Sequence, residues 1–171
     1  MELTDLLSID AWMDFEKKIH AETGLDCNIF NPDGYRITEF KEWVNRLCPV
    51  IKDNDKGQSY ICAVAHMNLA AQAKQQKNTV IEECDAGLVK LVVPVFYDDD
   101  FLGAFGACGL LMDDGIADTF MINRTIELDE EEIEKLSDDI QSISSADLIT
   151  TGGNIEKKIN RIILQAKRAS A

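Results

Sequence analysis

Four cysteines and one histidine in the middle of the chain are the side chains best suited to chemistry. They lie on segments whose apolar patterns predict burial, so we expect them to converge in the interior. Thiolate sulfur and imidazole nitrogen bind zinc, and a set made mostly of cysteine could also hold an iron–sulfur cluster or haem iron. These five residues are Cys48, Cys62, His66, Cys84 and Cys108.

A metal site competes with simpler interpretations of the same side chains. Cys62 and His66 are four residues apart on a predicted helix, so they project from one face and could bind an ion together with Cys48 and Cys84. However, the chain has no Cys-x-x-Cys pair, and a free cysteine commonly packs as a small apolar residue. Three interpretations stay open: thiols that line a pocket or core, a zinc, iron–sulfur or haem site, and a redox switch that closes a disulfide.

Sequence motifs for catalysis are missing from the chain. It has no glycine-rich phosphate loop, no Gly-x-Ser-x-Gly and no His-Glu-x-x-His. Cys62 and His66 could act as nucleophile and base, but their spacing of one helical turn leaves no evident oxyanion donor or third orienting group. We therefore expect that the protein is not an enzyme.

The composition is typical of a soluble globular protein with an acidic surface. The 171 residues are 46% hydrophobic and 28% charged, which suits one domain with a sizeable core. The net charge of −14 argues against direct nucleic-acid binding, because phosphate contacts need Lys and Arg. No apolar run approaches the roughly 20 residues that span a bilayer, and the N-terminus does not resemble a signal peptide. We expect a cytoplasmic protein without membrane contact.

Three helices are predicted in the first half of the chain from apolar residues at helical spacing. The first covers residues 8–23, with Ser8 as its N-cap and Gly24 as its C-terminal cap. The second covers residues 40–51, and the third covers residues 59–77. The last two helices carry three of the five candidate residues.

Five strands are predicted between and after these helices. The turn residues Asn31-Pro32-Asp33-Gly34 predict a hairpin between two short apolar or β-branched runs. Residues 79–84, 89–97 and 101–112 predict three more strands, the last two joined by an acidic turn. The simplest packing is an α+β fold with a five-stranded antiparallel sheet, as in PAS-like and GAF-like domains.

Glycine and alanine in the interior of the last strand indicate a face that another group approaches closely. We expect this face and the helices that carry Cys48 and Cys62 to enclose a small-molecule cavity. The cysteines and His66 would line it with two small residues and three aromatic ones. These five additional lining residues are Ala104, Gly106, Phe30, Phe96 and Phe105.

Two further helices are predicted at the end of the chain. An acid-rich helix covers residues 129–143, and Gly152-Gly153 is expected to form a hinge before the final helix. The final helix has an apolar stripe that must pack against the domain body, a second copy or another element. This stripe consists of Ile155, Ile159, Ile162, Ile163 and Ala166.

The chain is accordingly divided into a domain over residues 1–150 and a C-terminal amphipathic helix over residues 151–171. Residues 154–171 hold five basic residues and one acid, whereas the rest of the chain is strongly acidic. This asymmetry predicts that the helix docks on the acidic body or on an acidic partner. We expect it to act as a connector or dimerisation element.

Several runs of the sequence resemble the PocR sensory domain family. FEKKIHAETGLDCNIFNPDGYRIT is similar to the opening of that domain, and RLCPVI followed by the helix with Cys62 is similar to its cysteine-containing helices. CDAGLVKLVVPVFYDDDFLGAFGACG resembles its Cys-x-Ala-Gly-Leu segment, proline-containing strand and glycine-rich last strand. DEEEIEKLSDDI resembles the acidic helix that follows. The resemblance covers residues 8–165 and is most specific over 84–109.

The resemblance implies a PAS-like fold that senses small molecules in bacterial and archaeal transcription regulators and sensor kinases. It also implies that Cys48, Cys62 and Cys84 belong to the family's cysteine pattern, whereas His66 and Cys108 rest on this sequence alone. The chain departs from such regulators because it shows no DNA-binding, kinase or methyl-accepting segment, so we expect a stand-alone sensor or a piece of a longer protein.

We therefore expect a small-molecule sensor for signal transduction or transcription regulation. It would act as a homodimer or on an effector protein through its last helix. The alternative is a redox sensor built on a cysteine-ligated metal, iron–sulfur cluster or haem.

Overall fold

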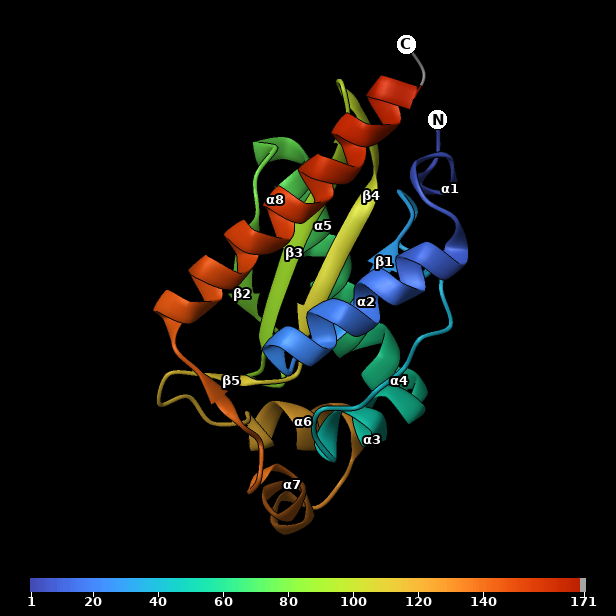
Figure 1. Ribbon diagram of the computed structural model, residues 1–171. Helices are drawn as coiled ribbons and strands as arrows, with labels where there is room; N and C mark the ends of the chain where they lie inside the picture. Colours follow the sequence, from blue (N-terminus) through green and yellow to red (C-terminus); the bar gives the residue numbers. More distant parts are fainter. Residues whose placement is uncertain (170–171) are drawn as a thin grey trace.

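A four-stranded antiparallel sheet organises residues 1–169, the part of the chain that the computed structural model describes (Figure 1). The spatial order is β1-β4-β3-β2, so β3 and β4 form the centre of the sheet. Two further short strands, β5 and β6, pair in parallel apart from it. The strands are β1 (Asp26–Phe30), β2 (Val80–Glu83), β3 (Val89–Tyr97), β4 (Asp100–Cys108), β5 (Leu111–Met112) and β6 (Ser142–Ile143).

Helices cover both faces of this sheet. Helices α2 and α8 pack on one face, and α5 packs on the other, while α6 and α7 lie at one end (Figure 1). One segment, η1, is a π-helix that leads directly into α5, and such π segments are frequent at functional sites. The helices are α1 (Leu3–Leu6), α2 (Ile9–Thr23), α3 (Leu47–Asp53), α4 (Asp55–Gly57), η1 (Gln58–Ala63), α5 (Val64–Gln76), α6 (Thr119–Ile126), α7 (Glu130–Ser137) and α8 (Ser145–Ala169).

The α+β class is as expected, but the five-stranded sheet was a wrong prediction. The chain after the 31–34 turn pairs back on β1 only briefly, with one bridge between Phe30 and Arg36. It then leaves the sheet, because the Thr38 hydroxyl donates a hydrogen bond to the carboxylate of Glu16 on α2. The predicted strand 101–112 also ends early, at the left-handed Gly109 (φ 102°). The described residues therefore contain four strands in the main sheet.

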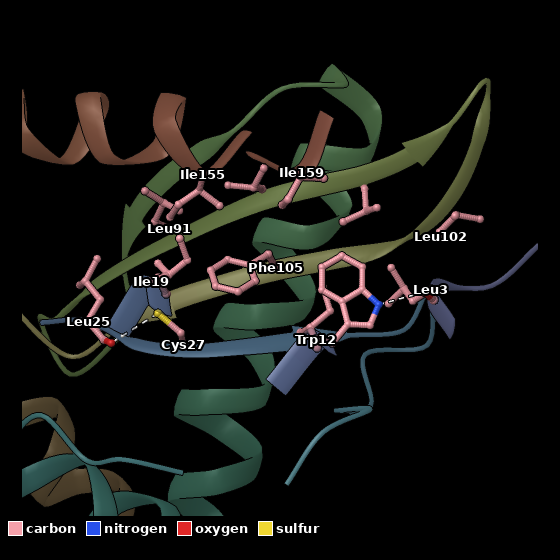
Figure 2. Close-up of a cluster of buried hydrophobic side chains, with 14 of the residues drawn as sticks. Leu3, Trp12, Ile19, Leu25, Cys27, Leu91, Leu102, Phe105, Ile155 and Ile159 are labelled. Carbon is pink, nitrogen blue, oxygen red and sulfur yellow. Dashed lines mark hydrogen bonds between the residues drawn. The ribbon is translucent and has the colours of Figure 1, made fainter. Parts of the chain in front are cut away.

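Alternating side chains give the sheet one apolar face, which packs on α2 and α8. Phe105 lies at its centre, with its ring edge-on to Phe15 at 5.3 Å between centroids. Figure 2 shows Trp12 and Ile19 of α2 and Ile155 of α8 around it. Since these side chains are fully or almost fully buried, this layer is the larger part of the hydrophobic core.

Helix α2 confirms its predicted caps, whereas the helix predicted over 40–51 starts late. The Ser8 hydroxyl accepts a hydrogen bond from the backbone of Ala11, and Gly24 ends α2 in the left-handed conformation (φ 71°). The helix predicted over 40–51 begins only at Leu47, and residues 41–46 form neither helix nor strand. The helix predicted over 129–143 likewise ends at Ser137, and the chain after it forms β6.

Helix α8 runs without a break from Ser145 to Ala169, so the hinge predicted at Gly152-Gly153 was wrong. Residue 150, the expected domain boundary, lies inside this helix. The apolar stripe packs on the body of the domain, where Ile155, Ile159 and Ile163 are buried. Within residues 1–169, no helix is long and apolar enough to cross a membrane.

Basic residues of α8 also pair with acids of the body, as the charge asymmetry predicted. Lys158 pairs with Glu22 of α2, and Lys167 pairs with Asp98 in the turn between β3 and β4. Both acids are partly or largely exposed, so each pair adds little stability. The pairs instead favour one docked orientation of α8.

The two glycines of α8 are expected to respond oppositely to alanine. A Cβ at Gly153 would meet open space, so Gly153→Ala should raise the free energy of unfolding by about 0.5–1 kcal/mol through helix propensity. A Cβ at Gly152 would lie 3.1 Å from Thr79 and 3.2 Å from Leu91. In Gly152→Ala these close contacts should cancel the gain from helix propensity, so the free energy of unfolding should not rise. Urea unfolding of both variants measures the difference, and equal gains would show that α8 does not pack closely on β3.

Candidate functional site

A cavity lined by several elements lies between the sheet and the segment formed by α3, η1 and α5. Its volume is about 360 Å³. Its floor is a row of three residues, in which Cys108 of β4 is the register partner of both Asp26 on β1 and Lys90 on β3. This is the sheet face opposite α2 and α8, so any molecule in the cavity is separated from α8 by one layer of strands.

The structure places the five candidate residues around this one cavity. They come from four different elements and from the turn after β2, which the fold brings together. Phe30 lines the cavity as well. The cysteines and histidine that line it are Cys48 of α3, Cys62 of η1, His66 of α5, Cys84 after β2 and Cys108 of β4.

Three of the cavity thiols are held in their protonated form. Burial is the main cause and raises the pKa of Cys48, of Cys62 and of Cys84, the last to about 11. A thiol must lose its proton to bind a metal or to attack an electrophile. At neutral pH these sulfurs therefore act as weakly polar lining.

The residues present do not fit a metal centre. Among residues 1–169, no group of three or more His, Cys, Asp or Glu side chains is arranged to hold an ion. The four-ligand set of Cys48, Cys62, Cys84 and His66 surrounds a cavity instead of converging on one point. We derive no metal chemistry from it.

His66 is a buried, neutral histidine with a free ring nitrogen. Its side chain stacks on Phe30, with 3.7 Å between the ring centroids, and its Nδ1 is buried without a hydrogen-bond partner. Burial lowers the pKa of His66 to about 3, and the charges of Lys90, Lys52 and Arg36 add to this effect. The neutral ring can offer a hydrogen bond to a molecule in the cavity.

The charged residues of the cavity were not predicted from the sequence. Asp26, Lys52 and Lys90 line it, and Asp26 and Lys90 are almost completely buried. A signal was present, because Asp26 and Asn28 alternate with apolar residues along β1, and Lys90 interrupts the apolar run of β3. Polar residues on one face of a buried strand indicate a second, polar environment on that side of the sheet.

Three expected lining residues lie elsewhere. Phe105 belongs to the opposite face of the sheet, because the side-chain alternation places it with Trp12. Phe96 packs edge-on against Phe101 near the far end of the hairpin, and Ala104 is covered by α5 together with Leu69. The cavity contains none of the three.

Gly106 does not line the cavity either, but it makes room for residues that do. A Cβ at this position would lie 3.3 Å from the Phe30 ring and 3.7 Å from Nδ1 of His66. The small residues of β4 thus admit the Phe30–His66 stack and helix α5. They do not leave an open space for a ligand.

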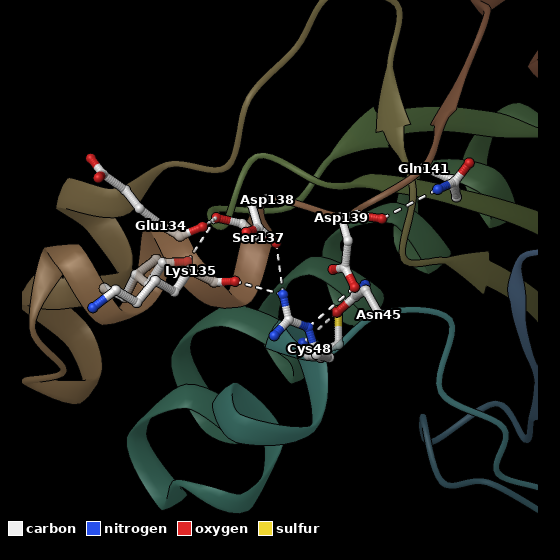
Figure 3. A network of polar contacts seen from close by, with 10 residues as sticks. Asn45, Cys48, Glu134, Lys135, Ser137, Asp138, Asp139 and Gln141 are labelled. Carbon is white, nitrogen blue, oxygen red and sulfur yellow. Dashed lines mark hydrogen bonds and ion pairs between the residues drawn. The ribbon is translucent and has the colours of Figure 1, made fainter.

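Polar contacts hold α3, one wall of the cavity, against the rest of the domain. The Asn45 amide donates to the carbonyl of Gly109, and its oxygen accepts from the backbone of Cys48 at the start of α3. The guanidinium of Arg46 binds Asp138 and Asp139 after α7. Figure 3 shows these two aspartates close to Asn45 and Cys48. These contacts position the wall in the absence of a regular strand or helix before it.

An α+β domain with a partly enclosed, partly polar cavity beside its sheet has the features of a ligand-binding domain. The comparison with known families agrees, because residues 5–166 match the family described as the sensory domain found in PocR. The chain belongs to this family and is a sensory domain. No curated protein and no solved structure matched the chain.

Proposed function

We propose that the domain senses a small molecule, which binds in the cavity between the sheet and α3, η1 and α5. The observation that carries this proposal is the set of buried polar atoms without hydrogen-bond partners beside the cavity, namely Oδ1 of Asp26 and Nδ1 of His66. Such atoms destabilise a folded protein unless a partner satisfies them. Both residues line the cavity, so a small rotation of either side chain would bring its atom to a bound ligand as that partner.

Binding without catalysis is the activity that these side chains favour. Cys62 and His66 would be the nucleophile and base of an enzyme, but burial raises the pKa of Cys62 and lowers that of His66. The thiol therefore stays protonated, and the nearby lysines add to the cost of an imidazolium.

Strand β3 offers a route from the cavity to the C-terminal helix. Lys90 points to the cavity side, and its neighbour Leu91 packs on the other face, close to Gly152 of α8. A shift of β3 on ligand binding would change how α8 packs on the sheet. We propose that α8 transmits this change to a second copy or to an effector protein.

Thiol labelling tests the proposed site with an internal control. At alkaline pH, which ionises part of the Cys62 thiol in spite of its raised pKa, methyl methanethiosulfonate should label Cys62 and Cys108, which are partly exposed in the cavity, and leave Cys27, which is buried on the opposite face. A panel of polyols, amino acids, organic acids and aromatic acids is then screened by thermal shift. Compounds that raise Tm should protect both cavity cysteines, as measured by peptide mass spectrometry.

Two results would count against the proposal. Stabilising compounds that leave Cys62 and Cys108 fully reactive would place the binding site elsewhere. A protected cavity with unchanged hydrogen exchange in α8 would retain the sensor but remove α8 as its output.

A further inference from the structure

Two lysines that line the cavity lack an acidic partner. Lys90 is only 8% exposed, and Lys52 sits on α3 with a lowered pKa, mainly because of its burial. Among residues 1–169, neither ammonium group lies within ion-pair distance of a carboxylate. A buried cation without a counter-ion is costly, and such groups are normally paired.

The acids near the cavity do not neutralise these lysines. Burial raises the pKa of Asp26, and among the neighbouring charges Arg36 opposes this most, ahead of Lys52 and Lys90. The buried Glu16 also lies near Arg36 and Asp26, so two acids face three cations here. Asp33, the other acid at the cavity, is exposed in the turn at its rim. The interior therefore carries an excess of positive charge in a chain whose net charge is −14.

The spacing of the floor residues leaves room for a ligand between opposite charges. Asp26 and Lys90 are separated by Cys108 in the row across three strands, so their backbones are about 10 Å apart. Oδ1 of the Asp26 carboxylate is buried without a hydrogen-bond partner. Nδ1 of His66 is also buried without one. The row thus presents an anion site at one end and a hydrogen-bond acceptor at the other.

The remaining surface of the cavity is apolar. Phe30 lies below the ammonium group of Lys90, which is 5.7 Å from the ring centroid, and Leu88 and Val89 add aliphatic surface. The thiols of Cys62 and Cys108 complete this lining. The ligand body that fits here is small and mainly carbon.

We infer that the cavity binds a small organic carboxylate that also carries a hydroxyl or amino group. Its carboxylate lies between Lys52 and Lys90, and its hydrogen-bond donor faces Asp26. This inference rests on the proposed sensory function and specifies the chemical class of the ligand. Charge-assisted hydrogen bonds from the two lysines would supply most of the discrimination against neutral molecules.

Matched pairs of charged and neutral probes test the inference on the whole chain. Lactate, malate and mandelate are titrated into ¹⁵N-labelled protein to millimolar concentrations, alongside their neutral amides lactamide, malamide and mandelamide. At least one carboxylate should give saturable shifts in β1, β3 and α3, and should bind at least about tenfold more tightly than its amide. Higher salt should weaken this binding.

Lysine variants locate the anion site. Lys52→Met and Lys90→Met keep most of the side-chain stem and remove the charge, and each should weaken carboxylate binding about tenfold while leaving amide binding unchanged. Lys56→Met, on the exposed surface of α4, is the matched control and should have no effect. Circular dichroism and Tm verify that each variant is folded.

The outcomes separate the inference from the proposed function. Equal or tighter binding of the amides at the same resonances would overturn the carboxylate class and retain a sensor of neutral ligands. Carboxylate binding that both lysine variants leave unchanged would overturn the assigned anion site. The absence of saturable shifts with every carboxylate would also overturn the inference, whereas the sensory function is decided by the cysteine protection experiment.

Discussion

Phe105→Ala is expected to lower the free energy of unfolding by about 3–5 kcal/mol, the range for deleting a large aromatic side chain from a packed core. Phe105 is completely buried at the centre of the apolar face of the sheet, where its ring meets that of Phe15 edge-on. Its replacement leaves a cavity that α2 and α8 can fill only partly. Urea unfolding monitored by circular dichroism measures the loss.

Phe96→Ala is the matched control for this substitution. Phe96 is only partly buried and packs against Phe101 near the end of the hairpin, so its loss should cost less than half as much. If Phe105→Ala had a small effect on stability but changed ligand binding, Phe105 would be a cavity wall, as first expected from the sequence, and not a core residue.

Asp26→Asn is expected to stabilise the protein at neutral pH, by about 1–3 kcal/mol if the buried carboxylate is unpaired. The raised pKa of Asp26 arises first from burial, opposed by Arg36, Lys52, Lys90 and His20. A carboxyl whose pKa is higher in the folded state favours folding at low pH. This contribution is lost as the pH rises above the ordinary value of 3.8 and through the folded-state pKa.

The pH dependence distinguishes this effect from a general change in packing. The stabilities of wild type and Asp26→Asn should converge below pH 3.8, where the carboxyl is protonated in the folded and the unfolded state, and separate as the pH rises. Asp33→Asn, on the exposed turn at the cavity rim, should change stability by less than about 0.5 kcal/mol. A less stable Asp26→Asn at neutral pH would show that the lysines already hold Asp26 as a favourable ion.

The local parts of the fold could be predicted because local patterns specify them. Ser8 and Gly24 mark the two ends of α2 through their own capping chemistry, and nearly continuous apolar runs mark β3 and β4. Prediction failed where a distant contact decides the conformation. Thr38 leaves the sheet for Glu16, a partner on α2 that no pattern within residues 35–46 reveals.

In the candidate site, too, some residues could be predicted from local patterns and others depend on distant contacts. Cysteine burial could be anticipated from flanking apolar residues, and the four cavity cysteines with His66 do surround one space. Phe105 was wrongly expected to line that space, because it lies three residues before Cys108 and strand alternation places the two side chains on opposite faces of β4. The hinge expected at Gly152 was wrong for a similar reason. The close packing of Gly152 on Thr79 and Leu91 exists only in the folded chain, so the sequence alone does not reveal it.

By itself, the sequence of this protein determined its α+β class, its family resemblance and the cysteines and histidine of its cavity. These depend on hydrophobic periodicity, turn chemistry and motif spacing, all of which act over a few residues. Only the tertiary structure decided that Asp26 and Lys90 lie in one row on either side of Cys108. Strand register is set by packing of the whole sheet, so the charges that define the proposed ligand class appear only after folding.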